Sequence, residues 1–235
     1  MIVIRRSAER GHADLGWINS YYTFTFAGYK DPAHMGFRAL RVINEDRIAP
    51  GRGFGAHAHR DMEILTYVLE GGLAHRDSMG EVHTFGADTI QAMSAGTGVI
   101  HSEFNASEHE PGHFLQIWIE PALTDAEPSY QQISYDPLEK RGRLRLLAAP
   151  RGSDHSEAAA IHQDAFVYTS VLGSGEDLRQ KLAPGRHAWV QVARGNVSIN
   201  GETLAQGDGA AVSEEQDLSF IGGSEGSEFL YFDLA

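Results

Sequence analysis

The chain contains no cysteine, which excludes thiolate metal ligands, disulfide bonds and cysteine nucleophiles. Any metal must therefore be held by nitrogen and oxygen atoms. Basic residues are also scarce: 19 Lys and Arg stand against 32 Asp and Glu, which gives a net charge of -13. Such a chain repels phosphate backbones, so we expect no direct contact with nucleic acid.

Long apolar runs are missing as well. Only four apolar residues precede Arg5 at the N-terminus, which is too short for the core of a signal peptide. No later segment approaches the roughly eighteen apolar residues of a membrane-spanning helix. We therefore expect a cytoplasmic protein that does not enter a membrane.

Short apolar runs separated by Gly, Asn and Asp dominate the sequence. Examples are "YYTFTFAGY" (residues 21–29), "EILTYVLEGG" (63–72) and "HFLQIWIEP" (113–121), each of strand length and rich in aromatic or β-branched residues. No segment carries a long repeat of 3.6 residues, so the pattern predicts an all-β fold with few short helices. We interpret the alternating aromatic residues of residues 21–29 and 113–121 as core, and not as the lining of a substrate pocket.

The sequence divides into two halves. Residues 122–154 contain or adjoin several prolines and have few strand patterns, which is typical of a crossing between domains. Beyond it, residues 187–216 repeat the order of strands and Gly turns found in residues 63–96. We predict two related β domains, 1–140 and 141–235.

Two histidines in "GFGAHAHRDME", residues 53–63, suggest a metal site. His57 and His59 are two positions apart, but with 12 histidines in 235 residues about 0.6 such triplets arise by chance. A second pair, His101 and Glu103, lies in "SAGTGVIHSEFN", residues 94–105. Side chains two apart on a strand share one face, so two such pairs on neighbouring strands can converge on one ion. The sequence thus allows a site of three histidines and one carboxylate.

Other histidines are weaker candidates. His155 and Glu157 repeat the second spacing, but among Gly, Ser and Ala residues without a strand pattern, so we interpret them as a loop. We interpret the remaining histidines as surface or packed polar residues, among them His75, His83, His109, His113 and His187.

The metal-site segments resemble known motifs. Residues 51–72 resemble the first cupin motif, and "GADTIQAMSAGTGVIHSE", residues 86–103, resembles the second. The match departs from the general cupin pattern: Glu63 is one position closer to His59 than is common, the usual proline before the last histidine is missing, and Glu103 follows His101. These departures resemble the pirin family, and the resemblance extends from about Ser20 to the C-terminus, weakening after Pro121.

The resemblance implies two tandem cupin domains, which are double-stranded β-helix (jelly-roll) barrels. It places one divalent transition metal in the N-terminal domain, at His57, His59, His101 and Glu103, while the C-terminal domain has lost the ligands. Fe(II) is the metal we expect first; nickel, copper, manganese, cobalt and zinc also suit a site of three nitrogens and one oxygen. Glu63 is then a polar strand residue or a group that orients a histidine, unless it replaces Glu103 as the carboxylate ligand, as in general cupins.

Within the pirin family, the chain looks similar to bacterial members with quercetin 2,3-dioxygenase activity. That similarity implies an enzyme that cleaves a flavonol with O₂ and releases carbon monoxide, with Glu103 as the base. We expect the chain to be a monomer. The alternative is a regulatory, non-enzymatic metal-binding module that acts through a protein partner, because the family also includes a nuclear partner of transcription factors.

Overall fold

The computed structural model describes all 235 residues, and the chain forms two compact units. The N-terminal unit comprises Gly11–Ser134 and Arg151–Gln163; the C-terminal unit comprises Met1–Arg10, Tyr135–Pro150 and Asp164–Ala235. The only helices are two single 3-10 turns, η1 (Ser7–Glu9) and η2 (Pro137–Lys140). The prediction of an all-β fold with few short helices is confirmed, and the structure has no helix suited to crossing a membrane.

The predicted domain ranges, 1–140 and 141–235, are continuous and stay a prediction. The compact units differ from these ranges because three short segments, residues 1–10, 135–140 and 151–163, pack with the other half of the chain. Met1–Arg10 belongs to the C-terminal unit, and Arg151–Gln163 belongs to the N-terminal unit.

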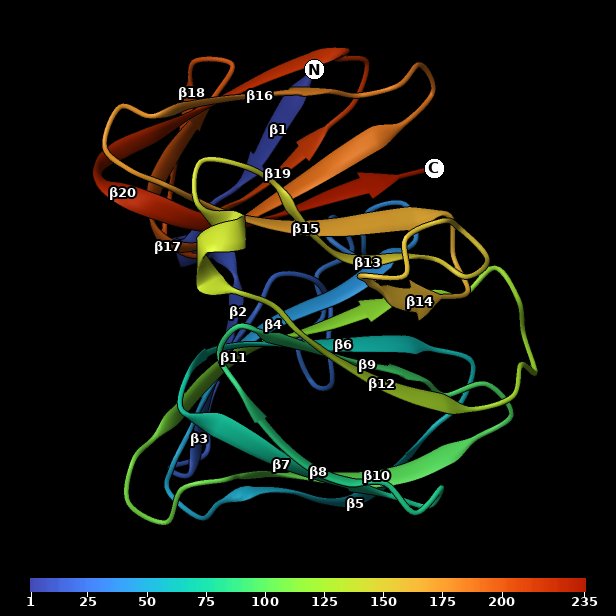
Figure 1. Cartoon of the computed structure of the whole chain (residues 1–235). Helices are drawn as coiled ribbons and strands as arrows, with labels where there is room; N and C mark the ends of the chain where they lie inside the picture. The colour runs from blue at the N-terminus through green and yellow to red at the C-terminus, as the bar shows by residue number, and fades with distance from the viewer. The chain divides into compact units, whose positions relative to one another are not determined.

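The N-terminal unit contains two antiparallel sheets (Figure 1). The first is seven-stranded, in the order β12-β9-β6-β11-β4-β3-β2. Its strands are β2 (Gly11–Asp14), β3 (Ile18–Tyr22), β4 (Leu40–Ile48), β6 (Glu63–Glu70), β9 (Thr89–Ser94), β11 (Gly112–Ile119) and β12 (Ser129–Ser134). The second is four-stranded, in the order β5-β10-β7-β8. Its strands are β5 (Gly53–His59), β7 (Gly72–Asp77), β8 (Val82–Gly86) and β10 (Val99–Asn105).

The two sheets of the N-terminal unit pack face to face at one end through apolar side chains. Val68 and Phe114 from the seven-stranded sheet meet Leu73 and Phe85 from the four-stranded sheet, and all four are buried. Burying each such side chain contributes about 1.5–3 kcal/mol. This contact closes the sandwich and leaves the inward faces beyond it available for polar residues. The short strand β14 (Ala159–Ile161) lies beside β12, where Gln131 Nε2 donates to the Ala160 carbonyl at 2.9 Å.

The C-terminal unit has a sheet in the order β1-β19-β17-β20-β15-β13, with β18 paired to β17 and β16 paired to β20. Its strands are β1 (Ile2–Arg5), β13 (Arg145–Pro150), β15 (Ala165–Leu172), β16 (Asp177–Lys181), β17 (His187–Ile199), β18 (Glu202–Ala205), β19 (Gly209–Val212) and β20 (Asp217–Leu234). Its interior is filled with apolar side chains, including Val190, Val197, Phe220 and Phe229.

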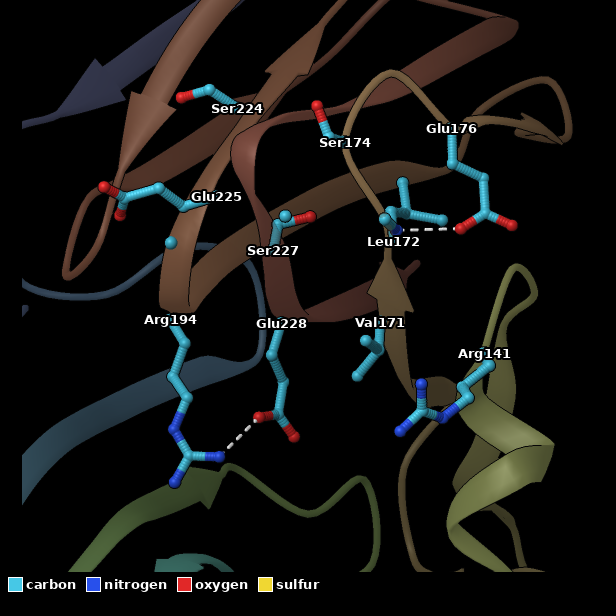
Figure 2. A pocket seen from close by; sticks show the side chains of 13 residues that line it. Arg141, Val171, Leu172, Ser174, Glu176, Arg194, Ser224, Glu225, Ser227 and Glu228 are labelled. Carbon is cyan, nitrogen blue, oxygen red and sulfur yellow. Dashed lines mark hydrogen bonds and ion pairs between the residues drawn. The ribbon is translucent and has the colours of Figure 1, made fainter.

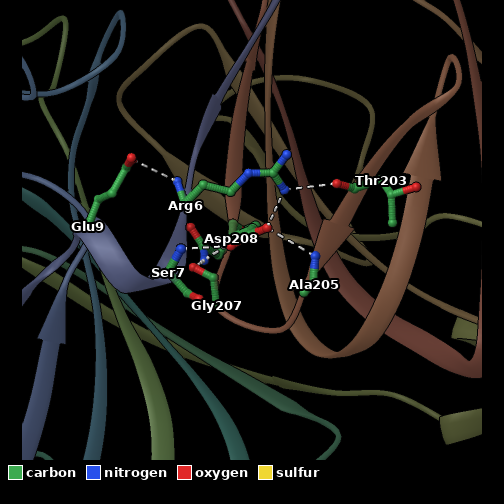
Figure 3. Close-up of polar contacts among 8 residues, drawn as sticks. Arg6, Ser7, Glu9, Thr203, Ala205, Gly207 and Asp208 are labelled. Atoms are coloured by element: carbon green, nitrogen blue, oxygen red, sulfur yellow. Dashed lines mark hydrogen bonds and ion pairs between the residues drawn. The ribbon is translucent and has the colours of Figure 1, made fainter.

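The first residues of the chain are fastened to the C-terminal unit by Asp208 (Figure 3). Strand β1 pairs with β19. Arg6 and Ser7, which follow β1, donate hydrogen bonds to the carboxylate of Asp208, from Arg6 Nη1 at 2.8 Å and from the Ser7 backbone N–H at 2.7 Å. The same carboxylate accepts the Ala205 N–H at 3.1 Å. In Figure 1 the blue strand β1 accordingly lies among the orange and red strands of this unit.

Candidate metal centre

Three of the predicted ligands meet on the four-stranded sheet. Strands β5 and β10 are antiparallel and place His57 opposite His101, with His59 opposite Val99. The ring centroids of His57 and His101 are 4.4 Å apart, and His59 lies 4.9 Å from each. One ring nitrogen from each of the three lies within 4.8 Å of the others, which is the spacing of atoms that share one metal ion.

The register between β5 and β10 shifts beside these histidines and changes which side chains of β5 face the site. Between the pairs His57–His101 and Phe54–Glu103, β5 advances three residues while β10 advances two, as in a β-bulge. The extra residue turns Phe54 to the same face as His57, although the two are an odd number of positions apart. At Gly53 the strands come so close that a Cβ would lie 2.2 Å from the Glu103 carbonyl oxygen.

Glu103 lies on the same face of β10 as His101, as the spacing predicts, and both are buried. The structure groups its carboxylate with ring nitrogens of His101 and His75, within 4.8 Å of one another. Gln116 Nε2 donates to Glu103 Oε2 at 3.1 Å, while Oε1 has no partner. Burial raises the pKa of Glu103 to about 7, against the opposing effect of the Gln116 hydrogen bond.

His75 and Asp77 form a buried pair that the sequence interpretation missed. Strand β7 pairs with β10 and sets His75 opposite Glu103 and Asp77 opposite His101. His75 Nε2 lies 2.9 Å from Asp77 Oδ2, and His75 Nδ1 has no partner. The spacing of two between His75 and Asp77 was a signal, but it is the register with β10 that brings the pair to the site.

His59 and His101 are suited to binding a cation because burial lowers the pKa of each ring and keeps it neutral. Burial lowers the pKa of His101 to about 3, with further lowering by the rings of His57, His59 and His75. Burial and the neighbouring His57 lower the pKa of His59 to about 4. Both ring nitrogens of His101 are buried without a partner. His57 Nδ1 lies 2.8 Å from the Gly55 carbonyl oxygen, which leaves its Nε2 for a ligand. The residues present thus fit a divalent transition metal.

Glu63 lies outside both groups. Ser94 Oγ donates to Glu63 Oε2 at 2.6 Å, and His162 Nδ1 lies 3.2 Å from Oε1. Its carboxylate is therefore occupied by partners other than His57, His59 and His101. The pair that the sequence analysis assigns to a loop, His155 and Glu157, is exposed, and His155 Nδ1 lies 3.3 Å from Glu157 Oε1.

A cavity of about 410 Å³ adjoins the histidines, and His57, His59 and Glu103 are part of its wall. Five aromatic side chains line it: Trp17, Tyr22, Phe26, Phe54 and Trp118. The interpretation of residues 21–29 and 113–121 as core only was therefore wrong for Tyr22, Phe26 and Trp118. Alternation indicates which residues face inward, but an inward face borders a cavity as well as a core.

The C-terminal unit has an open groove of about 660 Å³ that no histidine lines (Figure 2). Two of its carboxylates pair with protein atoms: Glu228 is bound by Arg194 at 3.0 Å and by Lys140 at 2.8 Å, and Glu176 Oε2 accepts the Gly173 N–H at 2.8 Å. Both groups of side chains with metal-binding spacing lie in the N-terminal unit.

The fold and the site define a class of protein: an all-β protein with a histidine-rich candidate metal centre in its N-terminal unit. Comparison with known families is more specific. Residues 3–119 match the family model described as Pirin, and residues 146–234 match the model of the quercetinase C-terminal cupin domain. The chain belongs to the pirin family and consists of two tandem cupin domains, as the resemblance implied.

Relatives match along the whole chain. Quercetin 2,3-dioxygenase of Escherichia coli K12 is 47% identical over 100% of this chain and 99% of the relative, and a putative quercetin 2,3-dioxygenase of Pseudomonas aeruginosa is 40% identical over 100% of both. The crystal structure of YhhW from E. coli has a TM-score of 0.94 at 46% identity, covering 100% of this chain and 98% of that one. The nickel(II) complex of the bacterial pirin YhhW has a TM-score of 0.92 at 45% identity, covering 100% and 99%.

Proposed function

We propose that the protein is a metal-dependent quercetin 2,3-dioxygenase, which cleaves a flavonol with O₂ and releases carbon monoxide. The observation that carries this proposal is the convergence of His57, His59 and His101 beside an aromatic cavity whose wall includes His57 and His59. Full-length relatives named quercetin 2,3-dioxygenase support it. A cytoplasmic location and a monomeric state belong to the same proposal.

The proposed ligands are His57, His59, His101 and Glu103, which hold one divalent transition metal. Fe(II) is the ion we expect first, and nickel is a strong second because a crystal structure of the E. coli relative contains it. Three imidazoles and one carboxylate accept several such ions, so cellular supply decides among them. When bound, the ion supplies a Lewis-acid position at which a deprotonated flavonol and O₂ are activated.

Glu103 is the proposed base for the flavonol 3-hydroxyl. It lines the cavity, and its Oε1 is buried without a partner. Gln116 holds the other oxygen at 3.1 Å and so fixes the plane of the carboxylate. A base in this position removes the hydroxyl proton and returns it as the ring opens.

The cavity wall has two further tasks. The aromatic side chains pack against a flat substrate and orient it toward the histidines. They also exclude water, which strengthens electrostatic interactions at the site. A volume of about 410 Å³ lies within the range of small-molecule sites, about 300–1,000 Å³.

The test is aerobic incubation of the metal-reconstituted protein with quercetin, following the loss of flavonol absorbance and the release of carbon monoxide. We expect multiple turnovers with at least one of Fe(II), Ni(II), Co(II) and Mn(II), and none with the His101→Ala variant. Absence of turnover with every metal would contradict the enzyme and favour the alternative, a metal-binding regulatory module with a protein partner.

A further inference from the structure

A row of polar side chains crosses the cavity wall on the seven-stranded sheet. Register pairs Ser20 with Asp46, Tyr22 with Asn44, and Asn44 with Gln116. Asn44 and Asp46 are two apart on β4 and share one face. All five residues line the same cavity as His57 and His59, which come from the four-stranded sheet. The reacting end of the cavity and the polar row thus belong to different sheets.

The polar row presents hydrogen-bond acceptors that lack donors. Asn44 Oδ1, Asp46 Oδ1 and Gln116 Oε1 are each buried without a partner. Gln116 has its orientation fixed, because its Nε2 donates to Glu103 and its oxygen must point elsewhere. The Ser20 hydroxyl hydrogen-bonds to the Asp46 carboxylate and still leaves Oδ1 unpartnered. Buried acceptors without donors cost free energy, so the cavity favours a ligand that supplies donors.

The charge of the residues that line the cavity limits the chemical class of the ligand further. No Lys or Arg lines the cavity, whereas the carboxylates of Asp46 and Glu103 do. An anionic group beside Asp46 would be repelled, but a neutral O–H group would be bound. The aromatic walls select a flat ring to carry that group. A phenolic hydroxyl meets both conditions.

We propose that Asp46, with Asn44 beside it, is a specificity-determining subsite that accepts hydrogen bonds from phenolic hydroxyls other than the reacting 3-hydroxyl. That the ligand is a flavonol depends on the proposed function. The subsite makes the protein selective for polyhydroxylated flavonols over flavonols that lack the additional hydroxyls.

The test compares quercetin with 3-hydroxyflavone, which keeps the reacting hydroxyl and lacks the others. The metal-reconstituted full chain is titrated with each in the absence of oxygen, so that no turnover occurs, following fluorescence of Trp17 and Trp118 in the cavity wall. We expect wild type to bind quercetin about ten- to a hundredfold more tightly, as when buried acceptors that lack partners gain hydrogen-bond donors.

Three variants test the assignment to Asp46. Asp46→Leu, which removes the acceptor, should reduce this preference about tenfold or more, and Asp46→Asn, which retains an acceptor oxygen, should restore part of it. Asp177→Leu is the matched control, because Asp177 lies exposed in the C-terminal unit, and its preference should equal that of wild type. Should Asp46→Leu fail to fold by circular dichroism, Asn44→Leu should reduce the preference in the same direction.

Equal binding of the two flavonols by wild type would overturn the subsite, as would an unchanged preference in folded Asp46→Leu. The result is separable from the proposed function because the titration requires no turnover. Selective binding without turnover would contradict the proposed dioxygenase function and support the subsite. Turnover of both flavonols with no selectivity in binding would contradict the subsite and support the dioxygenase function.

Discussion

Glu103 is the residue whose two proposed tasks, metal ligand and base, can be separated by a single atom. Glu103→Gln should retain most of the metal, because three imidazoles remain, and should lose about 10² to 10⁴ in quercetin turnover, because an amide cannot accept the proton. Metal content by elemental analysis and turnover by absorbance measure the two effects. Glu63→Gln is the matched control and should stay active; an inactive Glu63 variant beside an active Glu103 variant would exchange their roles.

Asp46 has a consequence for stability as well as for specificity. Burial raises its pKa to about 7, opposed by the Ser20 hydrogen bond and assisted by Glu45. Between the pKa of the unfolded chain, about 4, and pH 7, the folded state therefore holds a proton that the unfolded state has lost. This group's contribution to the free energy of unfolding falls as pH rises through that window, by about 1.4 kcal/mol per pH unit, and is constant above it.

Asp46→Asn removes this slope. In the metal-free protein, the variant should gain stability relative to wild type as pH rises from about 4 to 7, with no further gain above pH 7. Urea unfolding at a series of pH values measures the difference. A constant difference across the window would show that Asp46 does not titrate there.

At the same scale, the sequence identifies the three histidines that the structure brings together better than it identifies their surroundings, and the ligand set that adds Glu103 stays a prediction. His57, His59, His101 and Glu103 follow from spacing on strands and from the family resemblance. His75, Asp77 and the cavity-lining Trp118 do not, because their roles depend on which strand lies opposite. Cross-strand register is set by the whole sheet and leaves no local sequence pattern.

Among the elements, β5 shows what strand prediction leaves out. Spacing indicates that His57 and His59 share a face, but it does not reveal the irregularity that turns Phe54 to that face. The irregularity arises from the pairing of β5 with β10, whose backbones leave no room for a Cβ at Gly53. A position without a side chain is therefore a condition of the metal centre, although glycine carries no chemistry itself.

Gly53→Ala should separate β5 from β10, because its Cβ would meet the Glu103 carbonyl oxygen at 2.2 Å and the Phe104 Cα at 2.4 Å. We expect a loss of about 1–3 kcal/mol in stability, as for overpacking, together with weaker metal binding. Gly55→Ala is the matched control on the same strand, since nothing lies within 4 Å of a Cβ built there. Thermal unfolding and metal titration of both variants measure the difference. Equal stability and metal affinity in the two variants would show that the close approach of β5 and β10 at Gly53 is not required.

Strand β1 is a second element whose place the sequence does not indicate. Its apolar residues predict only a short run, yet it pairs with β19, some two hundred residues later in the chain, Ile2 opposite Val212. The pairing of β1 with β19 is stabilised by Asp208. This carboxylate is buried, and Arg6 Nη1 and the Ser7 backbone N–H supply the donors that it needs.

For the whole molecule, the two cupin units have interiors of opposite character. In the N-terminal unit the cavity wall carries His57, Glu103, Asn44 and Asp46. In the C-terminal unit the equivalent space is filled by apolar residues such as Val190 and Phe229. The weak repeat in the sequence predicts the shared architecture, and the difference in polarity decides which unit carries chemistry.

That difference predicts the metal stoichiometry of the chain. Both groups of suitably spaced ligands lie in the N-terminal unit and share His101, so they compete for a single ion. We expect one equivalent of tightly bound divalent metal per chain, measured by titration of the metal-free protein and by elemental analysis. His101→Ala should reduce it to near zero without unfolding the protein, because His101 lies outside the apolar core. His155→Ala, which alters the exposed pair with Glu157, should still bind one equivalent. Two tight equivalents in wild type, or an unchanged content in His101→Ala, would show that the ion is held elsewhere.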